Sequence, residues 1–136
     1  MTDAQGALVY TMVVASACDG GMSDRELDRL GEMIRFLPVF ETFDPARIGQ
    51  LTDDCIAAMQ DEEGLDGLMD QILVSLPEHL RETAYAIACD VVAADGTASQ
   101  TELRFLEMLR HQLMVDRLTA AAIERGARAR SQRLEH

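Results

Sequence analysis

The chain has no lysine and no tryptophan, and few of its residues are aromatic. Aromatic side chains make up 4% of the 136 residues, although apolar residues of all kinds make up 48%. A core with so few rings must be built from Leu, Ile, Val, Ala and Met, which favour packed helices over a β-sandwich. No stretch alternates clearly between polar and apolar residues, so no strand is predicted. We therefore expect an all-α protein with a single domain over residues 1–133.

Positive charge is scarce and unevenly distributed. All twelve cationic side chains are Arg, and they face 24 Asp and Glu, which gives a formal net charge of −12. An acidic surface repels phosphate backbones and anionic lipids, so nucleic acid is not an expected partner. Residues 116–136 differ from the rest, because they carry five Arg and only three acids. The basic run within it either docks on an acidic surface or forms a solvated, frayed helix; its members are Arg125, Arg128, Arg130 and Arg133.

Long apolar runs, paired cysteines and a secretion signal are also missing. No apolar run approaches 18 residues, so membrane insertion is not expected. The three cysteines, an odd number without CxxC spacing, are Cys18, Cys55 and Cys89. We expect reduced, buried thiols and a cytoplasmic protein. The apolar residues 7–18 follow no basic segment, and residues 134–136 resemble the start of a purification tag, which we exclude from the domain.

Signals for helix starts and ends predict about seven helices. Two segments, at about residues 4–18 and 77–94, are apolar around most of their circumference, which is typical of helices surrounded by others. Each is followed by a glycine turn and an amphipathic helix. We therefore expect two pseudo-symmetric helical hairpins around a central buried helix pair. Asp44-Pro45 predicts the start of a helix that runs to about Gln60, and Asp116 predicts the N-cap of the last helix.

The most specific pattern occurs twice. ACDGGMSDREL, residues 17–27, and AADGTASQTEL, residues 93–103, share Asp-Gly-x-x-Ser-x-x-Glu-Leu at a separation of 76 positions. The Gly ends one helix, the Ser caps the next, the Glu completes a capping box, and the Leu is the first core contact. This interpretation does not account for the Asp. An acid at the negative end of a helix dipole costs about 0.3–1 kcal/mol.

Two interpretations of the repeated acids remain open. Each Asp either accepts backbone N–H bonds from the next helix or binds a cation. If the two corners meet, they bring together four carboxylates: Asp19, Glu26, Asp95 and Glu102. Such a cluster requires protonation or a neutralising cation, and all-oxygen ligands select Ca²⁺, Mg²⁺ or Mn²⁺. Asp90, in the second apolar helix, is either a fifth acid at this site or lies where the bundle opens to water.

These paired corners, each after a buried helix rich in Ala and Val, resemble the TerB-like (tellurite-resistance) family. The phrase LPEHLRETAYAIACDVVAADG, residues 76–96, resembles it too, and the resemblance extends over roughly residues 4–125. The first corner departs mildly, with Cys18 before its Asp. The resemblance implies an all-helical domain with internal pseudo-symmetry and a link to tellurite and other chemical-stress resistance. It also implies a metal site, at the matching positions Asp19, Glu26, Asp95 and Glu102.

The expected function is therefore a module that binds a divalent cation and acts through protein partners, a second copy of the chain included. The alternative is a metal-free interaction scaffold in which the repeated acids only cap helices. No enzyme is expected, because the sequence has no Ser/His/Asp set, reactive Cys context, phosphate loop or cofactor fingerprint.

Overall fold

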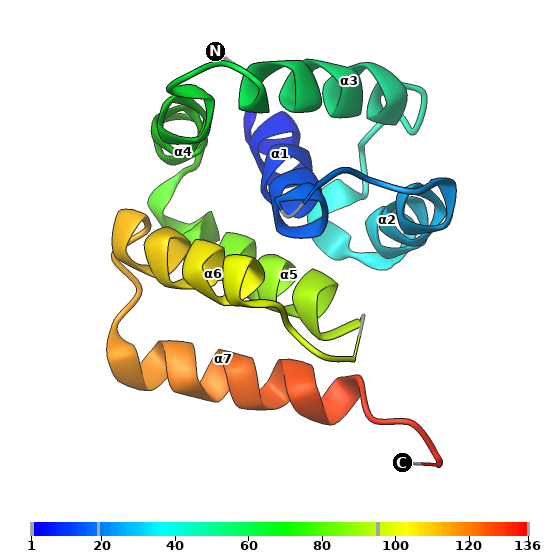
Figure 1. Cartoon of the computed structure of the whole chain (residues 1–136), viewed down its shortest axis with the longest axis vertical. Helices are drawn as coiled ribbons and strands as arrows, with labels where there is room; N and C mark the ends of the chain where they lie inside the picture. The colour runs from blue at the N-terminus through cyan, green and yellow to red at the C-terminus, as the bar shows by residue number, and fades with distance from the viewer. Residues whose placement is uncertain (1, 19, 95, 136) are drawn as a thin grey trace.

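Helices form all the regular structure of the described part of the chain (Figure 1). The computed structural model describes residues 2–18, 20–94 and 96–135. The α-helices are α1 Ala4–Ala17, α2 Asp24–Phe36, α3 Arg47–Met59, α4 Gly64–Ser75, α5 Arg81–Ala94, α6 Gln100–Gln112 and α7 Arg117–Arg130, and two 3₁₀ helices are η1 Pro38–Phe40 and η2 Glu78–Leu80. The prediction of an all-α bundle of about seven helices is confirmed. None of the described helices is long and apolar enough to cross a lipid bilayer.

Helix α1 occupies the centre of the bundle. Every residue from Gly6 to Ala17 is buried. The helix packs chiefly on α3, α4 and α5, and Figure 1 shows it nearly end on, beneath α3 and above α5. Helix α5 is the second buried helix and carries both α6 and α7. The predicted central pair of apolar helices is therefore confirmed, whereas the pseudo-symmetry of the two hairpins stays a prediction.

Helix α3 begins two residues later than the Asp44-Pro45 signal predicts. The Asp44 side chain accepts a hydrogen bond from the Ala46 backbone N–H at 3.0 Å, and the Asp44 carbonyl accepts one from the Arg47 N–H. These bonds close a turn ahead of the helix, which starts at Arg47. The acid therefore stabilises the approach to the helix and does not cap its first turn.

The fifth helix also begins later than predicted, at Arg81. Pro77 precedes a short 3₁₀ turn, η2, whose first bond runs from the Leu80 N–H to the Pro77 carbonyl at 2.9 Å. A 3₁₀ turn is a common way to enter an α-helix.

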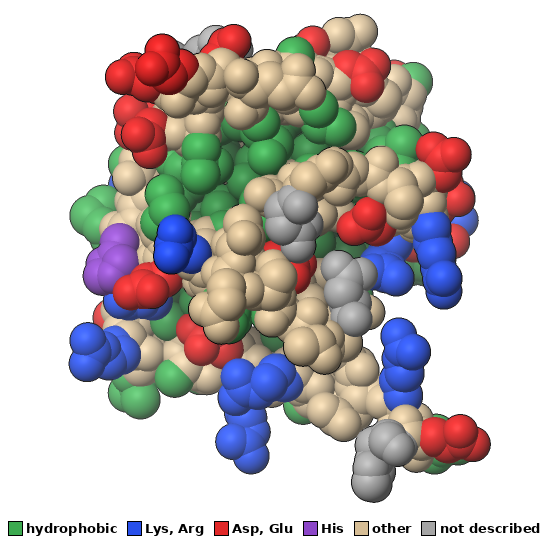
Figure 2. Space-filling view, in the orientation of Figure 1, with side chains coloured by type: hydrophobic (Ala, Val, Ile, Leu, Met, Phe, Trp, Pro, Cys, Tyr) green, Lys and Arg blue, Asp and Glu red, His purple; other side chains and the backbone are tan. Residues whose placement is uncertain are grey.

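Helix α7 is regular through Arg130, so the fraying predicted for the basic run is wrong for Arg125, Arg128 and Arg130, although these residues are exposed as expected. Asp116 caps it, as predicted, by accepting the Thr119 N–H at 2.9 Å. Two side-chain contacts attach α7 to α5, and each joins residues some 40 positions apart. On the face shown in Figure 2, Arg side chains gather over α7.

Two of the three cysteines are buried thiols, as predicted. Cys55 is fully buried and its thiol contacts the Tyr10 carbonyl, while Cys89 lies at the α5–α7 side of the core. Burial raises the pKa of each thiol to about 12, so both are protonated and unreactive at neutral pH. Cys18 is only half-buried.

Candidate cation site at two helix corners

The repeated pattern forms two helix–turn–helix corners. We call residues 17–27, between α1 and α2, the first corner, and residues 93–103, between α5 and α6, the second corner. Gly20 and Gly21 have φ of 138° and 125°, and Gly96 has φ of 92°. Residues with a Cβ rarely adopt such φ values, so glycine is required in the turn that follows each buried helix. The predicted role of the glycines is confirmed.

In the first corner, the Glu26 carboxylate is held by hydrogen bonds on both of its oxygens. Ser23 donates its backbone N–H to Glu26 Oε1 at 2.9 Å, and the Ser23 hydroxyl accepts the Glu26 N–H at 3.1 Å, which completes the capping box. Ser16, in the last turn of α1, donates to Glu26 Oε2 at 3.1 Å. The backbone bond from Ser23 is the largest of the causes that lower the pKa of Glu26. The side chain is therefore ionised and fixed in position.

The second corner has the same box but a more deeply buried acid. Ser99 donates its N–H to Glu102 Oε1 at 2.8 Å, and its hydroxyl accepts the Glu102 N–H at 3.1 Å. Val92 occupies the position that corresponds to Ser16, so that position supplies no hydroxyl to the carboxylate. Glu102 is only 5% exposed, whereas Glu26 is half-buried. The two corners thus share the capping box and differ in the burial of the Glu and in the hydrogen bonds that its carboxylate accepts.

Of the four predicted ligands, the structure describes Glu26 and Glu102. Asp19 and Asp95 lie outside the described residues. Within the remaining residues, no three His, Cys, Asp or Glu side chains gather as a metal-binding group. The helices that lead into the corners, α1 and α5, pack against each other.

Asp90 has a partner on α7. Its carboxylate forms an ion pair with Arg130 at 2.6 Å, and its side chain is 29% exposed. It also borders a shallow surface hollow beside Met33 and Phe36 of α2. Of the two sequence-based interpretations, these contacts favour the one that places Asp90 where the bundle opens to water.

One polar cluster escaped prediction from the sequence. Tyr85 of α5 donates its hydroxyl to Glu124 of α7 at 2.6 Å, at the edge of a cavity between α5, α6 and α7. The only signal in the sequence was a tyrosine among the small and aliphatic residues that helix α5 buries. Because Glu124 lies 39 positions away, the pairing depends on how α7 docks.

Comparison with known proteins agrees with this architecture. The chain matches the family described as "Tellurite resistance protein TerB" over residues 5–125, which include every helix up to the middle of α7 and both corners. No curated protein and no solved structure matches it significantly. Because the match extends over most of the sequence, the chain belongs to the TerB family.

Proposed function

We propose that this protein is a divalent-cation-binding module. Its ligands are Asp19, Glu26, Asp95 and Glu102. The observation that carries the proposal is the burial of Glu102, which is only 5% exposed. The ion pairs among the described residues join other acids, Asp3 and Asp90, to Arg side chains. A nearby cation stabilises a carboxylate that is removed from water and has no basic partner.

The donor set suits a hard ion. The four side chains offer only carboxylate oxygens, which suit Ca²⁺, Mg²⁺ or Mn²⁺ better than Zn²⁺. The capping boxes hold Glu26 and Glu102 in place before any ion arrives. A bound cation would supply positive charge between the corners and link the α1–α2 hairpin to the α5–α6 hairpin. The chain's own part is to hold and orient the ligands, and we propose no catalytic step.

The proposed setting is the cytosol, where the module responds to metal or chemical stress, including tellurite, by changing its contacts with protein partners. Two observations support this proposal. The family is the tellurite-resistance protein family. Cys55 and Cys89 are buried and unpaired with each other, as is usual in a reducing compartment.

A metal-free interaction scaffold is the second candidate. The completeness of both capping boxes favours it, because each Glu already accepts a backbone N–H and so has a structural role without a cation. In that case the acidic surface would recruit the partner.

Thermal melting of chelator-treated protein, titrated with Ca²⁺, Mg²⁺, Mn²⁺ and Zn²⁺, separates the two candidates. An ion at a hundred times its dissociation constant stabilises the fold by about 2.7 kcal/mol, a rise in Tm of about 5–15 °C. The double variant Asp19→Asn with Asp95→Asn should lose this rise. Glu102→Gln should weaken it while keeping a capping acceptor, and Asp28→Asn, an exposed acid on α2, should leave it unchanged.

The absence of a shift with every ion at millimolar concentration would reject the cation site and leave the scaffold. A shift that the double variant retains would reject the assigned ligands. Tellurite sensitivity of cells that express the wild type or the double variant then tests the stress role separately.

A further inference from the structure

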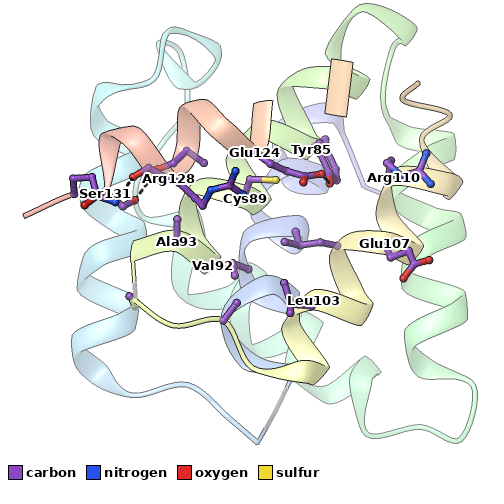
Figure 3. A pocket seen from close by; sticks show the side chains of 15 residues that line it. Tyr85, Cys89, Val92, Ala93, Leu103, Glu107, Arg110, Glu124, Arg128 and Ser131 are labelled. Carbon is purple, nitrogen blue, oxygen red and sulfur yellow. Dashed lines mark hydrogen bonds between the residues drawn. The ribbon is translucent and has the colours of Figure 1, made fainter. Parts of the chain in front are cut away.

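A cavity of about 490 Å³ lies between α5, α6 and α7 (Figure 3). Both α6 and α7 pack on α5, but they make little contact with each other. The space between them stays open because several side chains along it are small: Ala93, Gly96, Ala98, Ala127 and Ser131. The volume falls within the range of about 300–1,000 Å³ that is usual for small-molecule sites.

The base of this cavity is apolar. Val92 and Leu106, both nearly buried, contribute aliphatic surface, together with the protonated thiol of Cys89. Leu103 continues this surface to the mouth, where its side chain is 48% exposed. An apolar ligand of modest size would therefore exchange water for aliphatic contacts along its length.

Arg128 of α7 borders this apolar base. Glu124 and Arg128 lie one turn apart on α7, a spacing at which Glu and Arg commonly pair. Instead, the Tyr85 hydroxyl binds Glu124, and the ion pairs among the described residues do not include Arg128. Its guanidinium lies beside Cys89, as Figure 3 shows, and its positive charge acts on that thiol.

The other charged residues along the cavity are placed differently. Arg110 donates to the Val115 carbonyl at 3.4 Å and lies against His111 at 3.0 Å. Figure 3 shows Arg110 and Glu107 extending from α6 away from Cys89. Arg128 is therefore the cationic group most available to a ligand.

We propose that this cavity binds an amphipathic monocarboxylate. The apolar chain would lie on the α5–α6 base, and the carboxylate would accept two hydrogen bonds from the guanidinium of Arg128, a geometry that suits Arg better than Lys. Glu124 contributes to selectivity, because its negative charge disfavours a second acidic group on the ligand. The site is separate from the acids of the two corners and does not depend on the proposed cation.

Isothermal titration calorimetry of the full chain with octanoate, octanol and octylamine tests the proposal. Octanoate should bind at least about tenfold more tightly than the other two, because only octanoate offers an anionic acceptor to the guanidinium of Arg128. Arg128→Gln should remove this advantage. Arg125→Gln is the matched control, an exposed Arg on the same helix that does not border the cavity, and should bind octanoate as the wild type does.

A second variant locates the ligand. Ala98→Phe, at a half-buried position on the cavity wall, should fill the space and abolish octanoate binding, while circular dichroism shows an unchanged helical content. The corner variant Asp19→Asn with Asp95→Asn should bind octanoate normally. Tightest binding of octylamine, equal binding by Arg128→Gln, or no binding of octanoate would each overturn the proposal.

Discussion

At the scale of single residues, Gly64 shows how closely α3 and α4 approach each other. A Cβ at this position would lie 1.9 Å from the Ala58 carbonyl oxygen, which is backbone and cannot rotate away. Gly64 is also buried, so the strain cannot relax into solvent. Glycine is thus required here because there is no room for a Cβ, and not because of its φ.

We therefore predict that Gly64→Ala lowers the free energy of unfolding by about 1–3 kcal/mol, the usual cost of overpacking. Gly67→Ala is the matched control. It lies three residues along the same helix, is exposed, and its added Cβ would meet nothing within 4 Å. This second change should stabilise the helix by about 0.5–1 kcal/mol. Urea denaturation of both variants measures the effects, and equal signs would contradict the packing argument.

Single residues also show which contacts can be predicted from the sequence. Both capping boxes were predictable, because a box joins residues three positions apart and depends only on local geometry. The partner of Asp90 was not predictable, since Arg130 lies 40 positions away and reaches Asp90 only after α7 has docked on α5. The same limit applies to the cation site, because the approach of one corner to the other depends on packing and not on the repeat.

At the scale of helices, three N-termini each carry an acid whose pKa is lowered: Asp3 of α1, Glu26 of α2 and Asp116 of α7. For Glu26 and Asp116 the largest cause is a backbone N–H bond at the start of the helix. For Asp3 it is the hydrogen bond from Arg47. In each case folding favours the ionised form.

These caps predict a loss of stability in acid. A carboxyl group whose pKa is lower in the folded state stabilises the protein above its unfolded pKa, and this contribution disappears as the pH falls through the folded value. The Tm should therefore fall as the pH drops from 4.5 through 3.8 and below, the ordinary pKa values of Glu and Asp. The triple variant Asp3→Asn, Glu26→Gln, Asp116→Asn should have a flatter profile than Asp28→Asn. Parallel profiles would show that the caps do not cause the acid sensitivity.

Helix boundaries were predicted less well than the helices themselves. Helices α1 and α5 were recognisable because apolar residues occupy most of the circumference of each helix, a pattern typical of helices buried on all sides. The end of α7 was not recognisable in the sequence, since residues 124–130 alternate Arg with Gly and Ala and have no apolar stripe. Tertiary contacts order this segment, namely the hydrogen bond from Tyr85 to Glu124 and the ion pair between Arg130 and Asp90.

At the scale of the whole molecule, the excess of acids sets the response to salt. The net charge is −12, and ion pairs that join described residues to each other include Arg47–Asp3 and Arg130–Asp90, both with exposed Arg side chains. Exposed pairs contribute about 0.2–1 kcal/mol each, and salt weakens them. Repulsion among the surplus acids acts over the entire surface, and salt weakens it as well. The surplus acids outnumber the ion pairs. We therefore expect salt to stabilise the fold more by weakening the repulsion than it destabilises the fold by weakening the ion pairs.

We therefore predict that the Tm rises when NaCl increases from about 0.01 M to about 0.15 M, as the Debye length shortens from about 30 Å to about 8 Å. A fall would mean that the ion pairs and helix caps contribute more than the surplus charge opposes. The same comparison provides the baseline for the cation site, since MgCl₂ at equal ionic strength adds only screening unless Mg²⁺ binds. A rise with MgCl₂ beyond that of NaCl, lost in the Asp19→Asn, Asp95→Asn double variant, would separate a specific site from the general neutralisation of an acidic protein.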